Sequence, residues 1–329
     1  MATAETGHGS YVSFWEEATW GTDVRGSGTQ RSFDLASFTG SGVQYNRSPI
    51  DALASGSRTQ RGSFLASIVI EPEIELFCTF KSMGLFFKHA LGGTPATTGA
   101  SAPYTHTFLH ALTFPVGLTV EVNLGTSGES YVYTGCMIAS MEVMLVAAEV
   151  VKVKLKLIGK AVLRDTSPTA ASFVAGRDMT VDHRGFTSLT WGSLTAWTDV
   201  VQMATLKIDN KLSRRQRLGS AETARPVIDG FADFAIDTTL DHEAGGAILT
   251  AVSAASGTPG SLVLVLTDPT AAGNTITVTL HGAYAESAEL GKIPGPSIMS
   301  TVLKMRGQSY GSDGGIAVVV TNDAAAALT

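Results

Sequence analysis

Residues 131–160, YVYTGCMIASMEVMLVAAEVVKVKLKLIGK, contain the pattern that decides the fold class. Near the end of this stretch, apolar and basic side chains alternate strictly. Successive side chains of a β-strand leave opposite faces of the pleat, so a period of two predicts a half-buried strand. The apolar row is Val151, Val153, Leu155 and Leu157, and the basic row is Lys152, Lys154 and Lys156.

A second apolar row precedes the first and consists of Met141, Val143 and Leu145. These residue types suit a pleated surface. A helix is the alternative, but Glu142, Glu149 and the lysines would then be scattered around its circumference, leaving no apolar face of adequate width. The stretch therefore predicts two long antiparallel strands that turn near residues 147–149. The lysine face is expected to meet a partner surface.

Composition limits the classes of protein to which the chain can belong. Its 329 residues allow two domains of roughly 100–200 residues each. Charged residues make up 16%, which is low against a typical value of about a quarter and suggests that other protein covers much of the surface. The net charge of −6 argues against a dedicated nucleic-acid binder, because such a protein normally carries a basic footprint.

Compartment is indicated by the two cysteines, Cys78 and Cys136. They cannot make a disulfide framework, and two buried thiols in a reducing cytoplasm are the expected state. The first residues lack the basic and apolar regions of a secretory signal. No uncharged apolar run reaches the roughly 20 residues of a membrane helix. We therefore expect a soluble protein that is made and used without export.

The first half of the chain contains a long segment without sustained periodicity, residues 36–60, which includes Arg58 and is followed by Arg61. Such segments are usually functional or linkers, so an arm that orders against a neighbouring subunit is expected, with a surface loop as the alternative. Alternating strand patterns follow over 64–78 and are interrupted by Pro72, which fits a strand edge or bulge. A short helix is predicted over 82–91, capped by Ser82 and ended by Gly92-Gly93.

The second half repeats this order of elements, which predicts an internal duplication. The expected boundaries are an N-terminal segment (1–35), a first β domain with a long arm or loop at 36–60 (36–165), a linker (166–198), a second β domain (199–310) and a C-terminal tail (311–329). The matched pairs are 228–240 with 61–76, 242–255 with the short helix, 261–267 with 104–110, 274–290 with 118–135, and 296–307 with 150–160.

The last of these pairs places Gly307 as the counterpart of Gly159. It also adds Ile298 and Val302 to the candidate residues for the wall of a closed barrel. In the first hairpin these candidates are Val143, Leu145, Val151, Val153, Leu155 and Leu157. In this alignment the row that replaces the lysines is Ser297, Met299, Thr301 and Leu303.

Signatures of catalysis are missing from the sequence, which has no nucleophile elbow, phosphate-binding loop or dinucleotide fingerprint. His106 and His110 lie in a predicted strand, which separates them by about 13 Å, too far to share a metal ion. Cys136 follows Gly135 and is expected to be a small core residue. We therefore predict no enzyme, no metal and no cofactor.

The strongest cluster of charge is a basic run that contains Arg214, Arg215 and Arg217. It has no interleaved aromatic residues for stacking on bases. A contact with an acidic patch on a neighbouring subunit is the preferred interpretation, and a solvated loop or a nucleic-acid contact are the alternatives. The three lysines similarly form either a wet face that blocks edge-to-edge association or a strip that faces a subunit or a lumen.

Several of these stretches resemble siphophage major tail tube proteins, which build long, non-contractile tails. The opening FWEEATWGT (14–22) resembles the acidic-aromatic-Gly-Thr start of that family. The strand-then-helix unit ending at Gly92-Gly93, the strand over 118–124 and the Tyr131-x-Tyr133-x-Gly135 step are also similar. The resemblance covers residues 10–310.

The resemblance implies a mainly β fold of two tandem β-sandwich domains, each with a short flanking helix and an inner sheet that joins a multi-subunit β-barrel. It implies a structural virion protein that assembles into stacked rings, with three chains in pseudo-sixfold symmetry or six chains as the alternative. The implied partners are tail tip and terminator proteins, with tape measure protein and DNA in the lumen without sequence-specific binding. The implied location is the virion tail, after synthesis in the bacterial cytoplasm, with no membrane.

Physical arguments agree with this implied assembly. Closing sheets into a barrel removes their exposed edges, and stacked identical rings are a head-to-tail assembly. A lumen in which DNA slides should avoid dense positive charge. Two other functions remain open from the sequence: a tandem β-sandwich adhesin or decoration protein of a virion, and a hydrolase with an unrecognised site.

Overall fold

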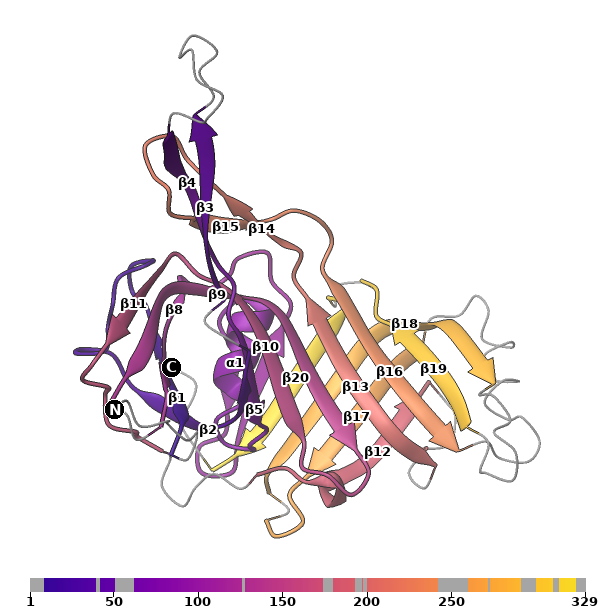
Figure 1. Cartoon of the computed structure of the whole chain (residues 1–329). Helices are drawn as coiled ribbons and strands as arrows, with labels where there is room; N and C mark the ends of the chain where they lie inside the picture. Colours follow the sequence, from indigo (N-terminus) through magenta and orange to yellow (C-terminus); the bar gives the residue numbers. More distant parts are fainter. Residues whose placement is uncertain are drawn as a thin grey trace.

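The chain is mainly β in a computed structural model that describes residues 9–39, 42–50, 62–125, 128–173, 180–192, 197, 200–241, 260–271, 273–290, 300–309 and 314–323 (Figure 1). Its first half contains β1 (Tyr11–Glu16), β2 (Arg31–Phe38), β3 (Val43–Ile50), β4 (Gly62–Ile70), β5 (Glu73–Phe77), α1 (Gly84–Leu91), β6 (Ala96–Thr98), β7 (Tyr104–Leu109), β8 (Leu118–Asn123), β9 (Ser130–Val146), β10 (Lys152–Ile158) and β11 (Ala161–Asp165). Its second half contains a 3-10 turn (His183–Gly185), β12 (Phe186–Trp191), β13 (Val201–Asp209), β14 (Leu212–Arg215), β15 (Ala224–Ile228), β16 (Asp233–Asp241), β17 (Gly260–Thr267), β18 (Thr275–Leu290), β19 (Ser300–Arg306) and β20 (Ile316–Asn322).

The predicted hairpin is confirmed, because β9 and β10 pair in antiparallel register with Val153 opposite Val143. The apolar side chains of the hairpin are buried, whereas the lysines point to the other side of the sheet. The period of two in the sequence therefore became the two faces of a strand, as expected.

This hairpin belongs to a continuous sheet of eight strands in the order β2-β5-β10-β9-β13-β16-β19-β18, which we call the long sheet. Figure 1 shows it sweeping from the first half of the chain into the second. One of its faces is apolar and packs into the core. The buried residues of that face include Ile74, Leu76, Met141, Leu206, Ile208, Ile236, Leu240, Leu303 and Met305.

Two outer sheets cover the apolar face of the long sheet, β1-β8-β9-β11 in the first half and β12-β17-β18-β20-β7-β6 in the second. Strands β9 and β18 are long enough to belong to both layers. They bend between layers next to Gly135 and Gly282, whose φ values of 66° and 54° lie in the left-handed region that glycine tolerates.

The long sheet has the same strand order in both halves, β2-β5-β10-β9 and β13-β16-β19-β18. The amide of Gly159 donates to Ile70 O at 2.9 Å, and the amide of Gly307 donates to Phe234 O at 2.9 Å. These equivalent bonds support the predicted pairing of the two glycines.

Other details of the matched pairs were wrong. Strand β17 lies against β18 as β8 lies against β9, so β17 is the counterpart of β8 rather than of 104–110. Strand β18 likewise corresponds to β9 rather than to 118–135. Strand β12 lies within the expected linker and β20 within the expected tail, and neither was predicted. The prediction of an arm or loop over 36–60 was wrong for residues 43–50, because they form β3 and pair with β4. The division into domains stays a prediction.

The short helix is confirmed as α1, but its start differs from the prediction. Met83 is the N-cap residue and no side chain caps the helix, so the assignment of Ser82 as the cap was wrong. Gly92 ends the helix with a φ of 80°, and its amide donates to Lys88 O at 3.0 Å. The second predicted helix, 242–255, lies outside the described residues.

The N-terminal motif anchors the chain to the bend in β9. The buried carboxylate of Glu17 accepts from the amides of Gly21 at 2.6 Å and Gly135 at 2.7 Å, and from the hydroxyl of Thr119 at 3.0 Å. The Trp20 indole donates to Gly135 O at 3.2 Å. Buried polar groups need such partners, so this single acid holds three separate segments together.

The preceding acid, Glu16, attaches helix α1 to β1. It contacts Lys88 at 2.7 Å and His89 at 2.8 Å. Burial alone would raise the pKa of Glu16, but the hydrogen bonds from His89 and Lys88 outweigh it and lower the pKa to about 2. The acidic pair of the FWEEATWGT motif therefore has a structural role.

Both cysteines are buried, as predicted, and they do not form a disulfide with each other. Burial raises the pKa of Cys136 well above its ordinary value. Cys136 packs in the core beside the bend in β9, which agrees with its interpretation as a small core residue.

We expect Gly135→Ala to destabilise the protein by about 2 kcal/mol or more, because a left-handed non-glycine residue costs roughly 1–2 kcal/mol and the added Cβ would lie 2.8 Å from Lys160 Cβ. Gly128→Ala is the control, since Gly128 has a φ of 70° but open space around its Cβ position. Urea unfolding of both variants measures the difference. Equal losses of stability would contradict the role of close packing at this bend.

Candidate functional site, a charged sheet face

The face of the long sheet that points away from the core carries many ionisable side chains, and we call it the charged face. Its position follows from the period of two, because each of its residues except Glu286, at the register shift of β18, is adjacent to a buried apolar residue of the same strand. The described acidic members are Glu73, Glu75, Glu142, Asp209, Asp233, Asp237, Asp241 and Glu286, and the basic members are Lys152, Lys154, Lys156, Lys207, Lys304 and Arg306.

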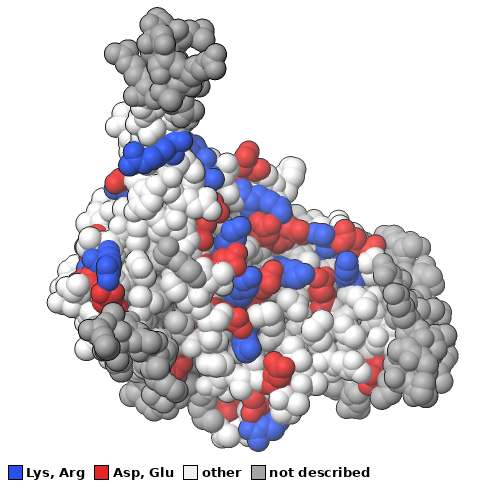
Figure 2. All heavy atoms as spheres, viewed as in Figure 1, with Lys and Arg blue, Asp and Glu red and all other residues white. Residues whose placement is uncertain are grey.

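The sign of the charge on this face changes from strand to strand. Strands β5, β9, β16 and β18 contribute carboxylates, β10 and β19 contribute basic side chains, and β13 contributes one of each. Figure 2 shows the resulting pattern, in which basic and acidic atoms are interleaved across the molecule. Opposite charges on neighbouring strands each stabilise a sheet by roughly 0.2–1 kcal/mol, so the pattern favours this strand order.

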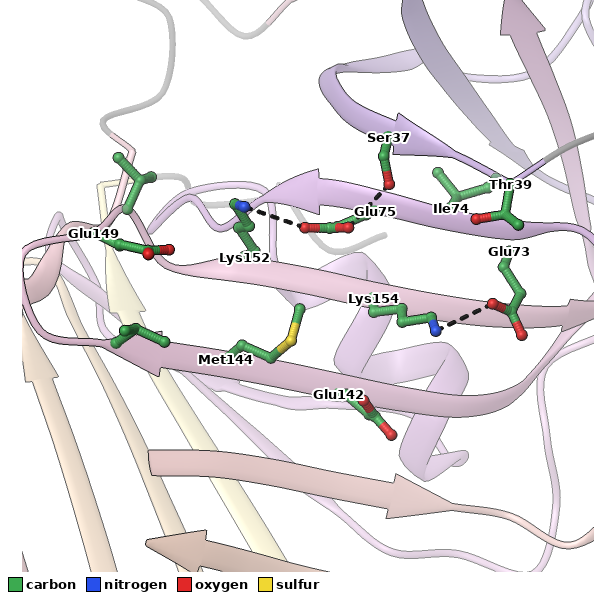
Figure 3. A pocket seen from close by; sticks show the side chains of 12 residues that line it. Ser37, Thr39, Glu73, Ile74, Glu75, Glu142, Met144, Glu149, Lys152 and Lys154 are labelled. Carbon is green, nitrogen blue, oxygen red and sulfur yellow. Dashed lines mark hydrogen bonds and ion pairs between the residues drawn. The ribbon is translucent and has the colours of Figure 1, made fainter. Parts of the chain in front are cut away.

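The lysine row of β10 lies between the acidic side chains of β5 and β9 (Figure 3). Lys152 contacts Glu75 at 3.5 Å, and Lys154 contacts Glu73 at 3.1 Å. The hydrogen bond that Lys154 donates to Glu73 raises the pKa of Lys154. Carboxylates of β5 therefore balance the charges of Lys152 and Lys154.

A second group of ion pairs lies on the other half of the charged face. Lys207 contacts Asp237 at 2.7 Å, and this hydrogen bond raises the pKa of Lys207 although burial opposes it. Arg306 contacts both Asp233 and Glu286, the latter at 2.7 Å, and the two carboxylates raise its pKa.

These ion pairs line two open hollows. One lies over β2, β5, β10 and β9 and has a volume of about 370 Å³, and the other lies over β9, β13, β16 and β19 and has a volume of about 300 Å³. Paired carboxylates and basic groups line both hollows, and in the first hollow the hydroxyl of Ser37 donates to Glu75 at 2.9 Å. Within the described ranges, no cluster of three or more His, Cys, Asp and Glu side chains is arranged to hold a metal ion. The helix of the described chain is neither long nor apolar enough to cross a membrane.

The candidate barrel-wall residues of the first hairpin all lie on the buried side of the long sheet. Val143, Leu145, Val151, Val153, Leu155 and Leu157 are at most 5% exposed. Val302 instead shares the charged face with Lys304, and Ile298 lies outside the described residues.

The prediction that Thr301 and Leu303 belong to the outward row that replaces the lysines was wrong. Thr301 and Leu303 are buried, so the outward row of β19 contains Lys304 and Arg306 instead. The spacing of two between these basic residues, interleaved with Leu303 and Met305, was the available signal. Cross-strand acids such as Glu73 and Asp237 could not be assigned without the register.

The basic run lies away from the charged face, at the projecting hairpin β14–β15. Arg214 and Arg215 belong to β14, so the run begins in a strand rather than in a loop. Arg214 Nε contacts Glu71 of the same chain at 2.8 Å, and Arg215 donates to Arg225 O at 3.2 Å. Arg217 is exposed. A contact with a neighbouring subunit stays a prediction for this run, and Arg58 and Arg61 lie outside the described residues.

The histidines of the first half lie apart, as their strand predicted. His106 is buried in β7, where its Nδ1 lies 2.9 Å from the hydroxyl of Thr97. His110 follows β7 and its ring packs edge-on against Phe234 with centroids 5.0 Å apart. Burial lowers the pKa of His110. Both histidines therefore have packing roles in this fold.

Comparison with known protein families identifies one match over nearly the whole chain. The family model described as phage tail tube protein matches residues 7–324. No curated protein matches the chain significantly.

We expect Lys154→Glu to lower the free energy of unfolding by about 1 kcal/mol at low salt, because it places a fourth acid among Glu73, Glu75 and Glu142. At 1 M salt the screening length falls to about 3 Å, so roughly half of the loss should disappear. Urea unfolding at both salt concentrations measures this change. Lys154→Gln removes the attraction without adding repulsion, so its stability should lie between those of the wild type and Lys154→Glu. A loss of stability that does not change with salt would contradict the proposed balance of charge.

Proposed function

This chain belongs to the phage tail tube protein family, and from that premise we propose that the charged face lines the lumen of a tube built from stacked rings of this chain. The protein is a structural component of the virion tail, with a mainly β fold. DNA passes through the lumen without sequence-specific binding. The observation that carries the proposal is the long sheet, with one face buried in its own core and the other face charged.

The number of strands supports a ring of three chains. Each chain supplies eight strands to the long sheet, so three chains supply 24. At a spacing of about 4.8 Å and a tilt of about 40°, such a barrel would measure roughly 48 Å between opposite backbones. Barrels of 16–18 strands already hold an aqueous channel, so this barrel would have a wide lumen.

The repeated strand order supports pseudo-sixfold symmetry within that ring. Each half contributes four strands, β2-β5-β10-β9 or β13-β16-β19-β18, to the wall. Six near-equivalent units would therefore surround the lumen. A hexamer that uses one half per chain would leave the other half of the long sheet outside the wall. The continuity of the long sheet across both halves therefore favours the trimer.

Balanced charge on the lumen wall fits the passage of DNA. Each phosphate that a protein neutralises releases counterions and tightens binding, so a row of unpaired lysines would retard the duplex. Here carboxylates accompany Lys152 and Lys154, and the described acids of the charged face slightly outnumber the bases. The wall would therefore guide DNA without holding it.

Stacking of the rings involves the two hairpins β3–β4 and β14–β15, which project together beyond one end of the long sheet (Figure 1). They contact each other, because the amide of Ile68 donates to Ala221 O at 2.8 Å. Identical rings that stack through unlike ends form an open, head-to-tail filament. The tail tip, terminator and tape measure proteins are the further partners of such a tube.

Purified protein at high concentration should form rings or tubes that negative-stain microscopy detects, with threefold rotational symmetry and six similar lobes in averaged top views. Mass photometry of single rings should give the mass of three chains of 34.3 kDa each. Only monomers at high concentration, with or without a tail-initiation complex, would refute the proposal and favour an adhesin or decoration protein.

Replacement of residues 212–228 by a short Gly-Ser turn should yield rings that no longer stack, because β14 and β15 pair only with each other among the described strands and the long sheet does not need them. Microscopy would show single rings in place of tubes, and circular dichroism would check that the β fold persists. Tubes of normal length from this variant would exclude the hairpin from stacking.

A further inference from the structure

The two halves of the chain meet at a β-sheet seam between β9 and β13, which we call the internal seam. Seven residue pairs join the strands in antiparallel register, from Met203 opposite Val146 to Asp209 opposite Ser140. The amide of Asn210 donates to Ala139 O at 2.9 Å, which makes Ser140 and Asp209 a non-hydrogen-bonded pair. In the order of the long sheet, β9 is the last strand of the first half and β13 is the first strand of the second half. The chain thus contains one example of how two such halves join.

The two lateral edges of the long sheet are strands of the same two kinds as those that meet at the internal seam, and each has a side without a described partner. At one end, Tyr284–Leu290 of β18 pair with β19 on one side, and no described strand pairs with their other side. At the opposite end, the outer edge of β2 beyond Asp34 also lacks a described strand partner. Such edges are sites of association.

Irregularities in the ladders fix which residues of β9 and β18 are equivalent. The register of β9 with β10 shifts between Lys156 and Leu157, where Ala139 is the extra residue. The register of β18 with β19 shifts at Glu286. Superposing the two bulges matches Lys156 with Lys304, and Ser140 with Ser287.

The pairing of β4 with β3 and of β16 with β13 fixes which residues are equivalent at the other edge. Gly159 and Gly307 bond to Ile70 and Phe234, so those two residues are equivalent. Ile70 lies opposite Val43, and Phe234 lies opposite Ile208. Val43 therefore takes the place of Ile208, and the next residue, Gln44, takes the place of Asp209.

Exposed aromatic side chains mark the same two edges. Tyr284 at the start of the free part of β18 is 42% exposed, and Tyr45 beside Gln44 is 62% exposed. These residues lie where a neighbouring chain would cover them.

We infer that neighbouring chains in the ring join through a seam that repeats the internal seam, with the free edge of β18 hydrogen-bonded to residues at the β2–β3 edge of a second copy. In this register, Ser287 of one chain lies opposite Gln44 of the next, as Ser140 lies opposite Asp209. The inference rests on the proposed ring, and it adds the strands and the register by which the ring closes.

A pair of cysteines at these positions tests the register. Non-hydrogen-bonded antiparallel pairs bring Cα atoms to about 4.5 Å, within the range for a disulfide. The double variant Ser287→Cys/Gln44→Cys, assembled and then oxidised with glutathione disulfide, should give covalent dimers and trimers on a non-reducing gel. Chains that carry Ser287→Cys mixed with chains that carry Gln44→Cys should give only dimers, which shows that the bond forms between chains.

Two matched variants control the experiment. Ser140→Cys/Asp209→Cys reports on the internal seam and should close a disulfide within one chain at a similar rate. Ser287→Cys/Val43→Cys displaces the pair by one residue and should cross-link roughly tenfold more slowly, because the two side chains leave opposite faces. The native thiols should not interfere, since Cys78 and Cys136 are both buried.

The possible failures are separable. Wild-type tubes in the microscope, together with an oxidised internal control but no bond between positions 287 and 44, would overturn the seam and leave the tube function standing. Faster cross-linking of the displaced pair would overturn the register. A wild-type protein that never assembles would instead overturn the proposed function itself.

Discussion

Backbone hydrogen bonding along the long sheet is the constraint on which the rest of the structure depends. Every strand in it needs a partner on both sides, because an unpaired row of amides and carbonyls invites association. Within the chain the constraint is met from β5 to β19, including across the junction of β9 with β13. At the outer edges of β2 beyond Asp34 and of β18 at Tyr284–Leu290, no described strand supplies such a partner. These edges are the reason why we infer a seam between neighbouring chains.

The two faces of that sheet divide the work of folding and function. The inward rows supply the apolar core, which the outer sheets and α1 close. The outward rows carry charges whose sign alternates from strand to strand, so that bases such as Lys154 and Lys207 contact acids of an adjacent strand. The same alternation that favours the strand order also keeps the charged face from presenting dense positive charge, which agrees with its proposed place in the lumen of a tail tube.

Passage of β9 and β18 between layers depends on a few residues near their bends. Gly135 and Gly282 adopt backbone conformations that other residues avoid, and in the first half Glu17 accepts hydrogen bonds from both the bend and the N-terminal turn. The acidic-aromatic start of the chain therefore matters because it fastens β1 to the point at which β9 leaves the long sheet. The second half achieves the same bend without a described counterpart of this acid.

The sequence by itself determined the local features of this protein. The alternation over 151–157 identified the hairpin, and Gly92 ended the helix, because each of these features depends on neighbouring residues. Only the tertiary structure decided which acids accompany the lysines, which face of β19 points outward, and that β12 and β20 complete the outer sheet. These features depend on the register between strands far apart in the chain, and a shift of one residue exchanges the two faces of a strand.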